Sequence, residues 1–238
     1  MQTEATIGIL GGMGPEATLD CFGKVLAHTP AGCDQEHLKI VIYNNPKVPD
    51  RTRAILEQGA SPLPALVRGA AALKQAGADF VIIPCVTAHF FLESLRAESE
   101  LPILSILDAV AQQIKKSQPQ AETIGLLGTS GTVQSGIFQK KLAQEGMAAL
   151  TCDEPMQQQV MEAIYEIKNK HTPLSPAEIT GKLAKAAEYL IQRGAQGIIA
   201  GCTEIPLALS QKDMPAPYFD SLSILARAAI RRAGREPV

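Results

Sequence analysis

FVIIPCVTAH, residues Phe80–His89, runs from a short apolar segment into a cysteine and a sequence that can open a helix. The apolar segment Phe80–Ile83 predicts a buried β-strand, and Cys85 follows shortly after its end. A second stretch has the same order, because the apolar segment Gly197–Ala200 leads into Gly201–Glu204 (GCTE), whose second residue is a cysteine. The chain therefore places two cysteines at equivalent positions, each at the carboxyl end of a predicted strand.

The similarity extends beyond the cysteines and indicates an internal duplication. Thr6–Leu10 (TIGIL) corresponds to Thr123–Leu127 (TIGLL), and Leu73–Ala78 (LKQAGA) corresponds to Leu190–Ala195 (LIQRGA). One offset of 117 residues superposes these segments and also the two cysteines (202 − 85 = 117). A repeat of about half the chain predicts two similar lobes, since solenoid repeats are much shorter.

Short apolar segments alternate with helical patterns, which predicts an α/β fold with a mostly parallel sheet, flanked by helices, in each of two pseudo-symmetric lobes. We expect the first lobe to comprise residues 1–105 and 219–238 and the second to comprise residues 106–218. Phe219–Arg232 has apolar residues on one helical face and predicts a C-terminal helix that returns to the first lobe. An active site in the cleft between the lobes would receive one cysteine from each.

Ligands of parallel sheets bind at the carboxyl ends of the strands. In the first lobe, Gly11–Gly14 follow the first predicted strand, Asn44 and Asn45 end the second, and Cys85–Thr87 follow the third. We therefore expect these three segments at one edge of the sheet.

Composition excludes several classes of protein. The 238 residues carry a formal net charge of −2 without a basic stripe, so nucleic acid is not an expected partner. No apolar run is long enough to span a membrane, and the N-terminal residues lack the basic segment that begins a signal peptide. Five cysteines without clustered spacing predict free thiols in the cytoplasm instead of a disulfide framework.

The position of the two cysteines suggests acid/base chemistry. A helix is expected after each cysteine, through Arg96 in the first case, with Thr87 and Thr203 as caps and Pro206 in a first turn. A thiol at a helix N-terminus has a lowered pKa. Two such thiols on opposite faces of one bound carbon could exchange its proton, one as base and the other as acid, and so invert the stereocentre.

These segments together resemble the cofactor-independent aspartate/glutamate racemases. The resemblance covers essentially the whole chain and rests on Gly11–Thr18 (GGMGPEAT), Pro49–Thr52 (PDRT), Pro84–His89 (PCVTAH) and Gly201–Glu204 (GCTE). It implies a homodimeric amino-acid racemase that needs no pyridoxal phosphate or other cofactor. It also implies that Cys85 and Cys202 are the catalytic pair and that the substrate is aspartate, with glutamate as the other candidate.

The resemblance also implies which residues hold an acidic substrate. Arg51 would grip a carboxylate through its planar guanidinium, and Lys168 matches a family lysine that meets the side-chain carboxylate. Val86 stands where the family commonly has asparagine; its side chain cannot hydrogen-bond, so backbone N–H groups would have to hold the carboxylate there. The other expected substrate-binding residues border the strand ends or the cysteines: Met13, Asn45, Thr87, Thr129, Thr132, Thr203 and Glu204.

Other interpretations stay open from the sequence. A racemase or decarboxylase of another substituted acid would use the same scaffold, and Val86 also leaves open a non-catalytic dicarboxylate-binding protein. A thiol–disulfide enzyme is disfavoured because neither cysteine forms Cys-x-x-Cys. Gly12–Ala17 fits a relaxed dinucleotide fingerprint, but the next strand ends in asparagines instead of an acidic residue. His89 lies four residues after Cys85, yet no second Cys/His pair completes a metal site.

Overall fold

The computed structural model describes residues 4–169 and 173–238, so the first three residues of the N-terminal segment discussed above lie outside it. The chain divides into two compact units. One comprises the residues up to Ala109 together with Leu222–Val238, and the other comprises Val110–Ser221. The division falls within helix α5 (Ile106–Ser117) and after the first residue of helix α10 (Ser221–Arg232).

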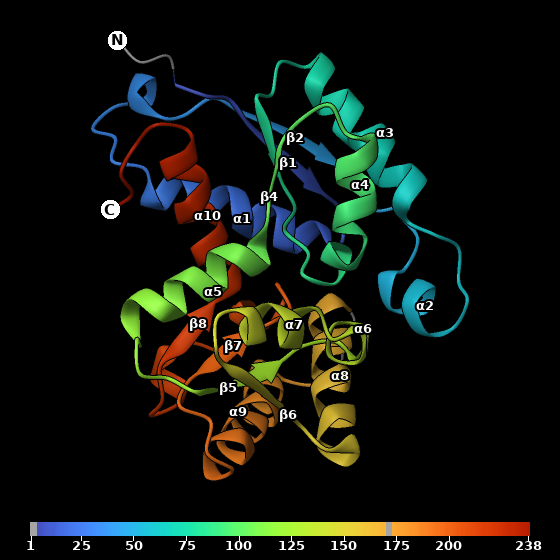
Figure 1. Ribbon diagram of the computed structural model, residues 1–238, viewed down its shortest axis with the longest axis vertical. Coiled ribbons are helices and arrows are strands. Elements are labelled where there is room, and N and C mark those ends of the chain that lie inside the picture. The colour runs from blue at the N-terminus through green and yellow to red at the C-terminus, as the bar shows by residue number, and fades with distance from the viewer. Residues whose placement is uncertain (1–3, 170–172) are drawn as a thin grey trace. The chain divides into compact units, whose positions relative to one another are not determined.

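The first unit contains a four-stranded parallel sheet with the order β2-β1-β3-β4. The strands are β1 (Ile7–Gly11), β2 (Ile40–Asn44), β3 (Phe80–Ile82) and β4 (Ile103–Leu104). The helices are α1 (Pro15–His28), α2 (Arg51–Leu56), α3 (Leu63–Gln75), α4 (Leu92–Glu98) and the 3-10 helices η1 (Asp34–Glu36) and η2 (Thr87–Phe91). Helix α3 lies on one side of this sheet, and α1 and α10 lie on the other (Figure 1).

The second unit repeats this topology. Its parallel sheet has the order β6-β5-β7-β8, so each strand follows its counterpart in the first sheet by four strand numbers. The strands are β5 (Thr123–Leu127), β6 (Ala148–Thr151), β7 (Ile198–Ala200) and β8 (Tyr218–Asp220). The helices are α6 (Ser130–Ser135), α7 (Ile137–Gln144), α8 (Glu154–Lys168), α9 (Pro176–Gln192), η3 (Ile205–Leu207) and η4 (Gln211–Asp213). The predicted α/β class with two similar parallel sheets is confirmed.

The repeated glycine of the first strand has the same role in both units. At Gly8 an added Cβ would lie 3.0 Å from the Cβ of Ala78 and 3.3 Å from Cδ1 of Leu73. At Gly125 it would lie 3.2 Å from the Cβ atoms of both Leu190 and Ala195. The first strand of each sheet needs glycine at this position. The end of the helix that leads into the third strand, α3 or α9, and the turn after that helix pack directly on the backbone of the first strand.

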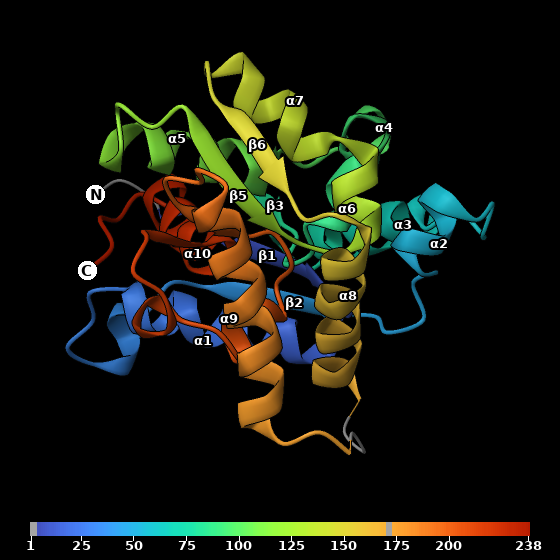
Figure 2. The same cartoon turned by 90° about the horizontal axis from the view of Figure 1, so that it is seen from below.

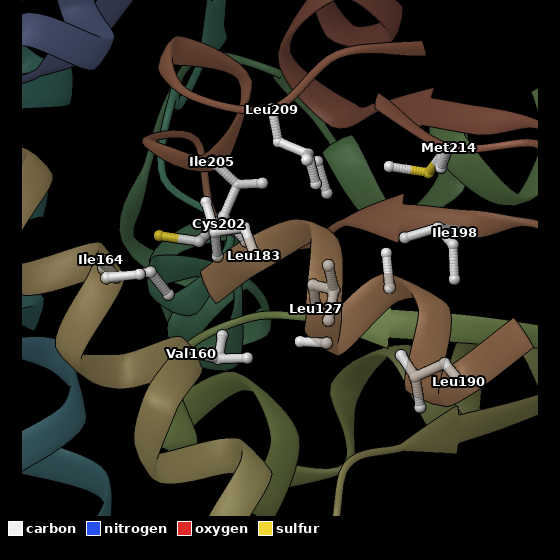
Figure 3. Close-up of a cluster of buried hydrophobic side chains, with 14 of the residues drawn as sticks. Leu127, Val160, Ile164, Leu183, Leu190, Ile198, Cys202, Ile205, Leu209 and Met214 are labelled. Atoms are coloured by element: carbon white, nitrogen blue, oxygen red, sulfur yellow. The ribbon is translucent and has the colours of Figure 1, made fainter. Parts of the chain in front are cut away.

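The core of the second unit extends from the sheet to the second cysteine. Helices α8 and α9 lie side by side (Figure 2), and Lys182 of α9 forms an ion pair with Glu162 of α8 at 3.0 Å. In Figure 3 the sulfur of Cys202 lies at one end of the cluster and points toward Ile164 of α8. The other labelled members are Leu127, Val160, Leu183, Leu190, Ile198, Ile205, Leu209 and Met214.

Two predicted helices are wrong in detail. Phe219 is not helical, because Tyr218–Asp220 pair with Ile198–Ala200 as β8 and the helix begins only at Ser221. The helix expected from Cys85 through Arg96 is instead the 3-10 helix η2 followed by α4. Among the described residues, no helix is both long and apolar enough to cross a membrane.

The packing at the repeated glycines predicts that adding a methyl group there lowers the stability of the protein. A glycine without close neighbours provides the matched control. Gly125→Ala should destabilise the protein by about 1–3 kcal/mol, because the new methyl group overpacks the contact with α9. Gly181→Ala is the control: Gly181 lies inside α9, and its Cβ would meet nothing within 4 Å. That change should stabilise by roughly 0.5–1 kcal/mol. Urea unfolding followed by circular dichroism at the helix band measures both; equal effects of the two substitutions would contradict the packing argument.

Candidate functional site

Cys85 is held in place through its backbone by His89. Cys85 follows β3 with 5% of its surface exposed. His89 Nδ1 lies 2.9 Å from the carbonyl oxygen of Cys85, and the backbone N–H of Ile106 donates to His89 Nε2 at 3.1 Å. Since a backbone N–H can only donate, Nε2 is the acceptor and Nδ1 carries the proton. Burial lowers the pKa of His89 to about 4, so the ring is neutral near pH 7 and links the Cys85 segment to the start of α5.

Arg51 is anchored by backbone carbonyls in the first unit. Its Nη1 donates to the carbonyl oxygens of Val48 at 3.2 Å and Pro49 at 2.9 Å, and its Nη2 donates to that of Met13 at 3.2 Å. The buried Nε–H has no hydrogen-bond acceptor in the part of the chain that the structure describes. The guanidinium is thus positioned beside Met13 with its buried Nε–H left for another partner.

The glycine turn after β1 lies against the end of β2. Gly12 has φ +99°, and a Cβ there would lie 2.3 Å from the carbonyl carbon of Asn45. The backbone N–H of Asn45 donates to the carbonyl oxygen of Gly11 at 3.2 Å. Thr18 of α1 accepts from the N–H of Gly12 at 2.9 Å and donates to the carbonyl oxygen of Gly14 at 3.1 Å. Met13 and Asn45 therefore lie at the carboxyl edge of the sheet, as the strand pattern predicts.

Cys202 contacts a buried carboxylate in the second unit. Its Sγ lies 3.0 Å from Glu204 Oε2 and donates a hydrogen bond to it, and Lys168 Nζ lies 3.4 Å from Glu204 Oε1. The hydroxyl of Thr203 donates to the same carboxylate at 3.4 Å. Glu204 is 2% exposed, and Cys202 is 5% exposed.

The electrostatics of this group keep Cys202 protonated. Burial and the Glu204 carboxylate raise the pKa of Cys202 well above its ordinary value, and the ammonium of Lys168 opposes this shift. At neutral pH the residue is therefore a thiol that donates to Glu204.

The expectation of a thiol activated by a helix N-terminus is wrong at Cys202. The helix that follows it, η3, has three residues, and η2 after Cys85 has five, so neither develops the dipole of a long α-helix. Thr87 and Thr203 are not the caps: Val86 and Glu204 stand at the cap positions, and neither side chain forms a cap hydrogen bond. Pro206 does lie in the first turn of η3, as expected.

The turn after β5 is bound by side chains from α8. Thr129 caps α6, since its hydroxyl accepts from the N–H of Thr132 at 3.1 Å. Gln157 of α8 donates through Nε2 to the carbonyl oxygen of Gly128 at 2.9 Å. The sulfur of Met161, also on α8, accepts from the N–H of Ser130 at 3.0 Å. Helix α8 therefore contacts this turn and, through Lys168, the Cys202 segment.

The expected substrate-binding residues fall into separate groups within each unit. In the first unit, Arg51 contacts Met13, and Val86 and Thr87 are both buried directly after Cys85. In the second unit, Lys168 and Thr203 meet at Glu204 beside Cys202. Thr129 and Thr132 form one turn, and both are buried.

Sequence reasoning did not single out Thr18, Gln157 or Met161 as site residues. A weak signal existed for α8: residues 157, 161 and 168 are separated by 4 and 7 positions, which is the spacing of one helical face. The described residues contain no group of three or more His, Cys, Asp or Glu side chains arranged to hold a metal ion.

Comparison with known proteins gives matches over almost the whole chain. The model of the Asp/Glu/hydantoin racemase family matches residues 10–229. The chain is 30% identical over 228 residues to the broad-specificity amino-acid racemase RacX of Bacillus subtilis (strain 168), a match that covers 94% of this chain and 96% of that protein.

Solved structures show the same fold. The structure of Picrophilus torridus aspartate racemase matches with a TM-score of 0.86 and 31% identity, over 98% of this chain and 96% of that one. An aspartate racemase homologue from Pyrococcus horikoshii OT3 matches with a TM-score of 0.76 and 27% identity, over 97% of this chain and 100% of that one. Because the family model, a relative and the folds agree over almost the whole chain, the chain belongs to the Asp/Glu/hydantoin racemase family and is an isomerase of the racemase type.

Proposed function

We propose that the protein interconverts L- and D-aspartate, with glutamate as a second acidic substrate, by moving the α-proton between Cys85 and Cys202. The observation that carries the proposal is the environment of Cys202: a buried thiol donates to Glu204, which is in turn paired with Lys168. Cys85 occupies the corresponding position after the third strand of the repeated sheet. A pair of equivalent cysteines, one of them kept protonated, suits a reaction that needs both an acid and a base.

In this mechanism one cysteine, as thiolate, removes the α-proton from one face of the substrate carbon. The other cysteine, as thiol, delivers a proton to the opposite face. Cys202, protonated at rest, is the donor in one direction. After delivery its thiolate faces the Glu204 carboxylate, so it regains a proton readily and acts as a strong base in the reverse direction. No redox change and no covalent intermediate are required.

The positively charged side chains of Arg51 and Lys168 support a dicarboxylate as the substrate. The buried Nε–H of Arg51 would satisfy its hydrogen-bonding capacity by donating to a carboxylate oxygen, since an unpaired buried donor costs about 1–3 kcal/mol. Lys168 contributes a second cation beside Glu204, and two cations suit a dicarboxylate. The Picrophilus torridus protein with the same fold is an aspartate racemase.

A broader substrate range is the second candidate. The Bacillus subtilis relative is named a broad-specificity amino-acid racemase, and Val86 offers no side-chain hydrogen bond to a carboxylate.

We also propose that the protein is a homodimer and lies in the cytoplasm. All five cysteines lie in the described part and are free thiols, which a reducing compartment preserves.

Replacing either catalytic cysteine tests the two-base mechanism. Cys85→Ser and Cys202→Ser should each lower the rate of aspartate racemisation by about 10²- to 10⁴-fold, because a hydroxyl is a far weaker base than a thiolate. Wild-type turnover in D₂O should incorporate deuterium at the α-carbon of both enantiomers, as followed by NMR. The exposed Cys33 provides the control, and Cys33→Ser should keep wild-type rates. If wild-type protein neither exchanges nor inverts aspartate or glutamate, the proposed function is wrong.

The charges beside Cys202 predict opposite effects of two substitutions. Glu204→Gln removes a cause of the raised pKa of Cys202, so iodoacetamide should alkylate this thiol faster at pH 8 than in the wild type. Lys168→Gln removes the opposing ammonium, so alkylation of Cys202 should be slower. Peptide mass spectrometry measures both rates, with the exposed Cys33 as the internal reference. A shift of both variants in the same direction would contradict this account.

Val86 predicts a change in substrate preference. Val86→Asn supplies a side-chain donor, which we propose meets the side-chain carboxylate of aspartate. Alanine lacks that carboxylate, so kcat/KM for aspartate relative to alanine should rise by about tenfold. Steady-state kinetics with both amino acids measure the ratio. An unchanged ratio in a variant with wild-type thermal stability would show that position 86 does not set specificity.

A further inference from the structure

Gln157 carries a buried acceptor that the proton-transfer scheme does not use. Its Nε2 donates to the carbonyl oxygen of Gly128 at 2.9 Å and lies 3.4 Å from the hydroxyl of Ser130. Since Gly128 offers an acceptor, the amide must turn its NH₂ group toward it, and this assigns the other atom as Oε1. Oε1 is buried and receives no hydrogen bond from any residue that the structure describes.

The turn that Gln157 contacts lies next to the Cys202 segment. The N–H of Gly201 donates to the carbonyl oxygen of Leu127 at 2.6 Å, and a Cβ on Gly128 would lie 3.2 Å from the carbonyl oxygen of Gly201. Gln157 therefore binds the turn that packs against the residue preceding Cys202. Lys168, eleven residues further along α8 and so on the same helical face, reaches Glu204.

The α-ammonium group of an amino-acid substrate needs a hydrogen-bond acceptor. Within this unit, Lys168 and the backbone N–H groups proposed to hold a carboxylate are donors, and donors cannot bind an ammonium group. The Glu204 carboxylate already accepts from Cys202 and Thr203 and pairs with Lys168. An α-ammonium group needs an uncharged or negative acceptor, and an amide oxygen is one.

We propose that Gln157 Oε1 accepts a hydrogen bond from the α-ammonium group of the substrate and so makes the site selective for amino acids over the corresponding dicarboxylic acids. This inference rests on the proposed function and adds a specificity-determining residue to it. Nε2 holds the amide on Gly128, and Oε1 is thereby kept beside the same turn.

The test compares ligands that differ only in the ammonium group. Isothermal titration calorimetry measures the affinity of wild-type protein and Gln157→Met for aspartate and for succinate, and for glutamate and glutarate. Methionine keeps the length of the side chain but removes both the acceptor and the Nε2 donor to Gly128, so binding of succinate and glutarate reports any effect of the lost donor. We expect the variant to lose about tenfold to hundredfold in affinity for the amino acids, the range for hydrogen bonds to charged groups, with succinate and glutarate within about twofold. The neighbouring exposed residue provides the matched control, Gln158→Met, which should change neither affinity.

A second variant guards against a folding defect. Gln157→Glu keeps an acceptor oxygen and adds a negative charge, but it loses the donor to Gly128. A defect of the turn alone should therefore weaken aspartate and succinate alike, whereas the added charge should weaken succinate binding more than aspartate binding. Equal losses for aspartate and succinate in Gln157→Met, or no loss for either, would mean that Oε1 holds a water molecule or only supports the turn, and would overturn the proposal. Failure of the proposed function itself is recognised separately, because then wild-type protein would neither bind nor racemise aspartate and glutamate.

Discussion

Close packing of a helix end on a glycine of the first strand is the constraint on which each unit depends. Gly8 and Gly125 leave no room for a side chain, because Leu73 and Ala78 in one unit and their repeat counterparts in the other rest on the strand backbone. The turn after each helix then enters the third strand, β3 or β7, beside the first. Each cysteine follows that strand, so this packing determines at which edge of the sheet the thiols emerge.

The two cysteine segments share a topology but differ in their chemical support. Cys85 is positioned through its carbonyl oxygen by a neutral histidine, whose low pKa removes it as a charge near the thiol. The thiol of Cys202 donates a hydrogen bond to the buried carboxylate of Glu204, which is paired with Lys168. The pairing matters because a buried carboxylate without a partner would be costly. The duplication preserved the backbone arrangement, whereas the side chains around each thiol diverged.

Many strands and helices of the fold can be predicted from local sequence patterns. Thr123–Leu127, the repeat counterpart of the first predicted strand, is itself a strand. Phe219 was assigned wrongly because its apolar neighbours fit a helical face equally well, and only pairing with β7 makes it a strand. The segment after Cys85 was assigned as a long helix because a single turn of 3-10 helix has no distinct sequence pattern.

By itself, the sequence determined the duplicated α/β architecture, the strand-end positions of Cys85 and Cys202, and the resemblance that the family match confirms. These features reside in spacing and residue type, which are local or repeated properties of the chain. Only the tertiary structure decided that Glu204 accepts from Cys202, that Lys168 is paired, and that the amide of Gln157 is anchored on Gly128. The physical reason is that the pKa of a thiol and the satisfaction of a buried amide depend on burial and on the atoms within a few ångströms, which packing of distant segments sets.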